Sequence, residues 1–131
     1  MNISVKLARI MGAAFVLTSI SLFNTTYFNA VVNDLVHSMG LLWVTGLMTF
    51  VTGCVLITLH NIWVKDWRVL ITIFAWLAAI KGAVIMVFPQ TMVYYQQLFP
   101  PNFLAFAGVY SGVIGLGFLY LGTLGKRYLR A

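Results

Sequence analysis

The sequence contains very few charged residues. Only 8% of its 131 residues are Asp, Glu, Lys or Arg, whereas about 25% is usual for a soluble domain. Asp34 and Asp66 are the only acids, and 62% of the residues are hydrophobic. So few charges cannot cover the surface of a soluble protein, and a chain this apolar is not disordered. The composition therefore predicts an integral membrane protein.

Cysteine and histidine are also scarce, which limits the chemistry that the chain can perform. Cys54 is the single cysteine, so a disulfide-bonded scaffold is excluded. We expect His37 and His60 on opposite sides of the membrane, too far apart to share a metal ion. The sequence has no Ser-His-Asp grouping at one depth, no phosphate-binding glycine loop and no paired carboxylates. We therefore expect no enzyme activity, no metal and no cofactor.

Four apolar runs are long enough to cross a bilayer, which takes roughly 20 helical residues. They cover approximately residues 7–23, 39–59, 69–88 and 103–124. Backbone groups in lipid must pair with one another, so such runs form helices. Residues 26–38 and 91–99 are expected to lie in the outer membrane interface, the first as an amphipathic helix. The predicted fold is one all-α domain over residues 1–131 with four transmembrane helices.

The net charge of +6 comes from basic residues at the ends of these runs. This distribution is typical of membrane orientation and not of a nucleic-acid interface. Segments 24–38 and 89–102 contain no Lys or Arg. The positive-inside rule therefore places both termini in the cytoplasm. Apart from Lys81, the basic residues all fall on that side: Lys6, Arg9, Lys65, Arg68, Lys126, Arg127 and Arg130.

The two halves of the sequence share a pattern of small residues. Gly46, Thr49 and Gly53 in the second span have the same spacing as Gly108, Ser111 and Gly115 in the fourth. The pattern predicts two tandem hairpins in parallel orientation, related by a pseudo-two-fold axis along the membrane normal. Together with Gly82 and Gly112, these residues are expected to pack helices closely. The packing is either within one four-helix bundle or between copies of the chain.

Lys81 lies inside the third apolar run, where a lysine is unfavourable. Its helical position is about 130° from the face formed by the alanines and glycine of that run. One interpretation is that its stem extends toward the outer headgroups. The other is that its ammonium group lines a cavity or subunit interface and meets anions or an acid such as Asp34.

The segment from His60 to Arg68 forms the expected cytoplasmic turn and contains two tryptophans, Trp63 and Trp67, that suit membrane-interface anchors. In the structural interpretation, Asn61 caps the end of the second span and Asp66 caps the start of the third. In the functional one, His60, Asp66 and Arg68 form a proton or ligand gate, because histidine titrates near neutral pH.

A longer pattern extends this turn. His60-Asn61-x-Trp63-x-x-Asp66-Trp67-Arg68, followed by Lys81-Gly82 and Phe88-Pro89, resembles a group of small four-helix bacterial inner-membrane proteins. Each half also resembles a two-helix bacterial membrane module in which a Phe-Pro turn leads into a glycine-rich helix. The first half departs from that module, with Asn24 where proline is expected. The resemblance implies a fold and a bacterial inner-membrane location but no activity.

Two classes of function follow from these expectations. The first is a small oligomeric channel or transporter for a small solute or an anion, because narrow small-residue contacts leave little room for a pore within one protomer. The second is an accessory or scaffold subunit that docks to a larger membrane complex. The expected partners are the lipid bilayer and either further copies of the chain or another membrane protein, with no nucleic acid.

Overall fold

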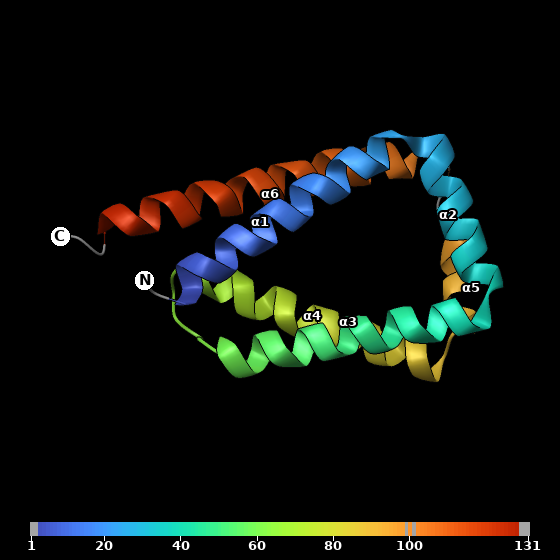
Figure 1. Ribbon diagram of the computed structural model, residues 1–131, viewed down its shortest axis with the longest axis horizontal. Helices are drawn as coiled ribbons and strands as arrows, with labels where there is room; N and C mark the ends of the chain where they lie inside the picture. The colour runs from blue at the N-terminus through green and yellow to red at the C-terminus, as the bar shows by residue number, and fades with distance from the viewer. Residues whose placement is uncertain (1–2, 99, 101, 129–131) are drawn as a thin grey trace. The chain divides into compact units, whose positions relative to one another are not determined.

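The computed structural model describes residues 3–98, 100 and 102–128. Six α-helices follow one another along these residues, and no strand occurs among them. The helices are α1 (Ile3–Phe23), α2 (Thr25–His37), α3 (Met39–Leu59), α4 (Arg68–Val87), α5 (Gln90–Leu98) and α6 (Phe103–Tyr128), shown in Figure 1. The chain is therefore all-helical, as the composition predicts.

Four helices, α1, α3, α4 and α6, are long and apolar enough to span a membrane. They agree with a multi-pass membrane protein. α1 begins at Ile3, earlier than the apolar run suggests, so Lys6 and Arg9 lie within its first turns. α6 likewise continues to Tyr128. In both helices the helical backbone continues past the end of the apolar run. Arg130 lies outside the described residues.

The remaining two helices, α2 and α5, are shorter and carry few buried side chains. Val36 is the single buried residue of α2, and α5 has none. The side chain of Asn24 accepts a hydrogen bond from the backbone N–H of Tyr27 at 3.4 Å, at the start of α2. These helices occupy almost the ranges expected for the interfacial segments, although Phe99, the last expected residue, lies outside the described residues.

The chain divides into two compact units. The first comes from the two ends of the chain, residues 1–28 and 100–131, and contains α1 packed against α6. The second covers residues 29–99 and contains α3 packed against α4, with α5 contacting α4. Within each unit the long helices run side by side in opposite directions (Figure 1).

In the first unit, hydrogen bonds cross between α1 and α6 at three levels. The Ser19 hydroxyl donates to the Gly108 carbonyl at 2.7 Å, and the Ser111 hydroxyl donates to the Phe15 carbonyl at 3.0 Å. Near the other end, Arg9 Nε donates to the Gly122 carbonyl at 3.2 Å. The glycines of α6 let the backbones approach closely, and this approach brings the hydroxyls within reach of the opposite carbonyls.

Gly112 and Gly115 show how tight this contact is. A Cβ atom added to Gly115 would lie 2.8 Å from the backbone nitrogen of Val16. One added to Gly112 would lie 2.7 Å from the Ser19 hydroxyl oxygen. Both distances are far below ordinary van der Waals contact, so neither position has room for a larger residue.

In the second unit, the backbones of α3 and α4 approach closely at Gly53 and Gly82. A Cβ atom added to Gly53 would lie 2.7 Å from the Cα atom of Ala79 and would also collide with the Ala79 nitrogen. One added to Gly82 would collide with the backbone of Phe50 and lie 2.8 Å from the Gly46 carbonyl oxygen. Thr49 is half-buried beside these residues, and its hydroxyl donates to the Thr45 carbonyl of its own helix at 2.7 Å.

Candidate functional site

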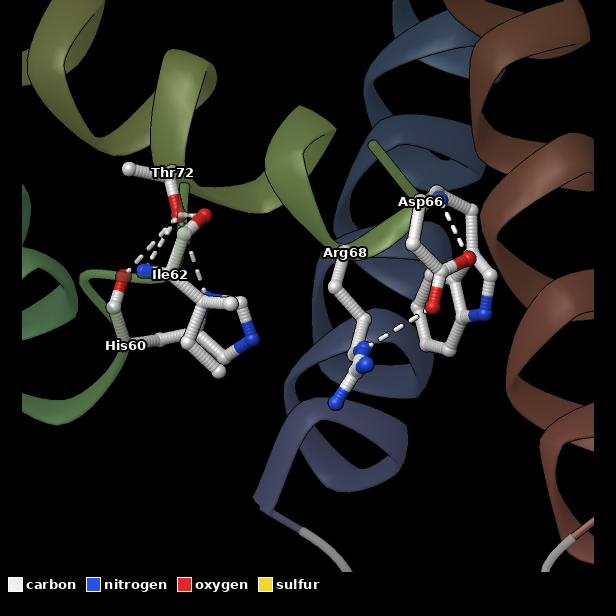
Figure 2. Close-up of polar contacts among 6 residues, drawn as sticks. His60, Ile62, Asp66, Arg68 and Thr72 are labelled. Carbon is white, nitrogen blue, oxygen red and sulfur yellow. Dashed lines mark hydrogen bonds and ion pairs between the residues drawn. The ribbon is translucent and has the colours of Figure 1, made fainter. Parts of the chain in front are cut away.

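The turn between α3 and α4 is organised around Thr72, in the second turn of α4. Its hydroxyl oxygen lies 3.2 Å from the His60 carbonyl oxygen and 3.1 Å from the Ile62 carbonyl oxygen, so it can donate to either. The same oxygen accepts a hydrogen bond from the backbone N–H of Ile62 at 3.2 Å. Figure 2 shows these contacts converging on one atom. Thr72 thus fixes the path of the chain just after α3.

His60 is part of the same group and is only 1% exposed. Its Nδ1 lies 3.3 Å from the Thr72 hydroxyl oxygen, and its backbone N–H donates to the Leu56 carbonyl at 2.8 Å. Burial lowers the pKa of His60 below its ordinary value of 6.5. A backbone hydrogen bond raises this pKa and the positive charge of Arg68 lowers it, but the net shift is downward. The neutral imidazole is therefore the form that this turn favours.

The expected helix caps are wrong in detail. His60, not Asn61, occupies the C-terminal cap of α3, and Trp67 occupies the N-terminal cap of α4 without a side-chain cap bond. The Asp66 carboxylate instead accepts a hydrogen bond from the backbone N–H of the next residue, Trp67, at 2.6 Å. An N-cap side chain reaches two or three residues forward, so a shift of one residue in the start of α4 removes Asp66 from that role.

The second carboxylate oxygen of Asp66 binds Arg68. Arg68 Nε donates to Asp66 Oδ2 at 3.0 Å, and both side chains are partly exposed. Figure 2 shows the Arg68 side chain directed toward Asp66, while Thr72 faces His60 and Ile62. The proposed gate residues therefore form two hydrogen-bonded groups: Asp66 with Arg68, and His60 with Thr72.

The tryptophans of the turn differ in exposure. Trp63 is 65% exposed, and its indole N–H donates to the Asn61 side-chain oxygen at 2.8 Å. The Trp67 side chain, by contrast, is half-buried. Asn61 therefore orients an exposed indole ring, which was not expected from the sequence. An indole with a paired N–H and a free apolar edge is suited to the membrane interface.

Lys81 lies at the other end of α4 from this turn. It is nine residues beyond Thr72, or about 14 Å along the helix axis. Its exposed side chain lines a groove of about 480 Å³ between α4 and α5. The other lining residues are apolar or aromatic: Leu77, Ile80, Val84, Met92 and Tyr95. Lys81 shares a sequence pattern with His60, Asp66 and Arg68. Its distance from them along α4 places it in a different site.

Thr72 is the member of the site that sequence reasoning missed. A threonine within an apolar helix gives no signal of its own, because its hydroxyl usually bonds to the preceding turn of the same helix, as in Thr45 and Thr52. Its role depends on where the chain after α3 lies. The only sequence feature that pointed to this role was a polar residue in the second turn of α4, twelve positions after His60.

No three metal-binding side chains come together among the residues that the structure describes. Every buried side-chain nitrogen or oxygen among them has a hydrogen-bond partner. Comparisons with protein-family models, with curated proteins and with solved structures each found no match to this chain.

Proposed function

We propose that the protein belongs to the bacterial inner membrane, with both termini and the α3–α4 turn in the cytoplasm. Seven of the eight basic residues lie near the termini or in this turn, and the segments at the other ends of the helices have none. The exposed Trp63 and the Arg68–Asp66 pair suit a headgroup environment at the same turn. The inner-membrane location agrees with the resemblance noted from the sequence.

We also propose that the two halves are an internal repeat, and the helix contacts support this. Phe23 is the last residue of α1, Phe88 is the C-terminal cap of α4, and the two are 65 positions apart. If Phe88 is aligned with Phe23, position 79 corresponds to position 14, and positions 82–86 correspond to positions 17–21. The contacts of the four matching glycines fall within two residues of these levels: Gly46 on Gly82, Ile85 and Met86; Gly53 on Ala79; Gly108 on Ser19 and Leu22; and Gly115 on Gly12 and Val16.

For its activity, we propose a small oligomeric channel or transporter that moves a small solute, preferentially an anion. The observation that carries this proposal is Lys81, a cation exposed on a membrane-spanning helix and surrounded by an apolar groove. No ion pair is found for it among the residues that the structure describes. A lysine in this position is unfavourable in lipid and concentrates anions where the dielectric constant is low.

The helix pairs themselves leave no room for a pathway. In both units the helix backbones meet at glycines, and a Cβ atom added at Gly53, Gly82 or Gly115 would collide with the opposite backbone. The hydroxyls at these contacts already bond to backbone carbonyls. A pathway must therefore run along surfaces outside the two pair contacts, and the exposed Lys81 face favours one formed between copies of the chain.

Anion flux into proteoliposomes tests this proposal. Wild-type protein should give anion flux above that of empty vesicles, and Lys81→Arg should preserve it because the charge remains. Lys81→Leu should abolish the flux while leaving the protein folded, because it removes the charge and keeps an apolar side chain. Lys65→Leu, which removes an exposed lysine of the α3–α4 turn, is the matched control and should retain flux.

Two results would contradict the proposal. Flux that is unchanged in Lys81→Leu removes Lys81 from the mechanism. The absence of any flux from correctly assembled wild-type protein rejects permeation and favours the accessory or scaffold role in a larger membrane complex.

A further inference from the structure

The groove between α4 and α5 has one charged group and otherwise apolar walls. Lys81 supplies the cation, and Leu77, Ile80 and Val84 line α4 beside it. Met92 and Tyr95 close the opposite side from α5. The residues of this groove all belong to the unit formed by residues 29–99.

This lining does not suit a small inorganic anion. Such an anion loses its water when it enters a groove and needs several hydrogen-bond donors in return. Among the lining residues only the Lys81 ammonium and the Tyr95 hydroxyl can donate from a side chain. The remaining walls would face the ion with hydrocarbon.

An anion that carries a hydrocarbon chain matches both parts of the lining. Its charged head pairs with the Lys81 ammonium, and its alkyl chain leaves water to lie against the apolar side chains of the groove. Lys81 lies six residues before the end of α4, about 9 Å along the axis, so the head sits close to the outer end of the helix. The tyrosine ring of α5 is suited to that interface region.

We propose that the α4–α5 groove binds a free amphipathic organic anion, with its head on Lys81 and its chain along Leu77, Ile80 and Val84. This inference rests on the proposed function, because it names the class of anion that the protein moves. The predicted substrate has a single anionic head group and a medium-length alkyl chain.

Equilibrium dialysis of the protein in phosphatidylcholine nanodiscs tests the inference, with empty nanodiscs as background. The probes are octanesulfonate and methanesulfonate, which share a permanently charged head and differ in chain length. Octanesulfonate should bind at least tenfold more tightly than methanesulfonate, because burying even a few methylene groups contributes that much. Equal affinity for the two probes would overturn the proposal.

Variants separate the charge from the groove. Lys81→Gln should weaken octanesulfonate binding about tenfold, since a charge-assisted contact is lost, whereas Lys65→Gln should leave it unchanged. Val84→Trp should also weaken binding because it fills the groove, and Val87→Trp, outside the groove lining, is its control. If Val84→Trp binds like wild type while Lys81→Gln does not, the lysine acts alone in the headgroup layer and the groove assignment is wrong.

Two further arms identify the source of the ligand and separate this inference from the proposed function. If anionic phosphatidylglycerol nanodiscs abolish octanesulfonate binding, the occupant is a membrane lipid and the free-anion proposal is overturned. Lys81-dependent octanesulfonate binding without flux would support the groove and reject permeation. Lys81-dependent flux of methanesulfonate, with no octanesulfonate binding, would support permeation and reject the groove as a binding site.

Discussion

Both helix pairs have close backbone contacts at glycines, but α1–α6 is also joined by side-chain hydrogen bonds along its length, whereas α3–α4 is held at one end by a hydrogen-bonded turn. In the first pair, side chains of Ser19, Ser111 and Arg9 donate across the contact. In the second, Gly53 and Gly82 meet the opposite backbone directly, and Thr72 fixes the turn. Both pairs have the same antiparallel arrangement.

The difference follows from the connectivity of the chain. α3 and α4 are neighbours in sequence, so a short turn holds their ends together and little else is needed across the membrane. α1 and α6 come from opposite ends of the chain, and no turn between them limits their separation. Hydrogen bonds spread over the contact supply that constraint, because lipid provides little hydrophobic drive for helix association.

The largest effect is expected from filling the backbone contact of α3–α4. Gly53→Val should lower the free energy of unfolding by about 3 kcal/mol, because the added atoms collide with the Ala79 backbone. Titration with SDS in mixed micelles measures this loss. Gly40→Val in the same helix is the control, since nothing lies within 4 Å of a Cβ atom there. Equal losses in the two variants would contradict the close contact.

A smaller loss is expected when the α3–α4 turn is released. Thr72→Val preserves the shape of the side chain but leaves the Ile62 N–H without its partner, which should cost about 1–3 kcal/mol. Thr45→Val is the control because its hydroxyl bonds only within α3. The same SDS titration compares the two. A loss no greater than that of Thr45→Val would show that the turn does not depend on this hydroxyl.

The corresponding test of α1–α6 removes one hydrogen bond across the contact. Ser19→Ala should cost about 0.6 kcal/mol, the average for such bonds in membranes, and no more than about 1.7 kcal/mol. Thr18→Ala, whose hydroxyl bonds to the Ala14 carbonyl of the same helix, should be nearly neutral. If both changes have the same effect in unfolding titrations, hydrogen bonding does not distinguish the two helix pairs.

The smallest effect is a pH dependence confined to the turn of α3–α4. The pKa of His60 is lowered by burial, so below pH 6.5 the unfolded chain takes up its proton more readily than the folded chain. Stability should be constant above that pH with respect to His60 and should fall as the pH drops below it. His60→Gln should remove this part of the slope in titrations at several pH values. An unchanged slope would contradict a buried neutral His60.

Hydropathy and charge predicted the parts of the fold that depend on local sequence. The four long helices and the two short ones lie close to their expected ranges because each needs only its own residues to be apolar or amphipathic. The pairing of α1 with α6 could not be predicted, since Ser19 and Gly108 carry no mark of their contact.

The candidate site shows the same limit. His60, Asp66 and Arg68 were found because polar residues are rare in this sequence. The roles of Asn61 and Asp66 were misjudged, because capping depends on helix ends that sequence defines only within one or two residues. Thr72 was missed because its hydroxyl acts through backbone atoms of the preceding turn, whose position is a tertiary property.

The most direct test of the central claim is the ratio of anion flux to cation flux in proteoliposomes for wild type and Lys81→Glu. Wild-type protein should favour anions, because the ammonium group attracts them in a low-dielectric groove. Reversing the charge should reverse the preference, so that Lys81→Glu favours cations. A ratio that is the same in both proteins would contradict a role for Lys81 in permeation.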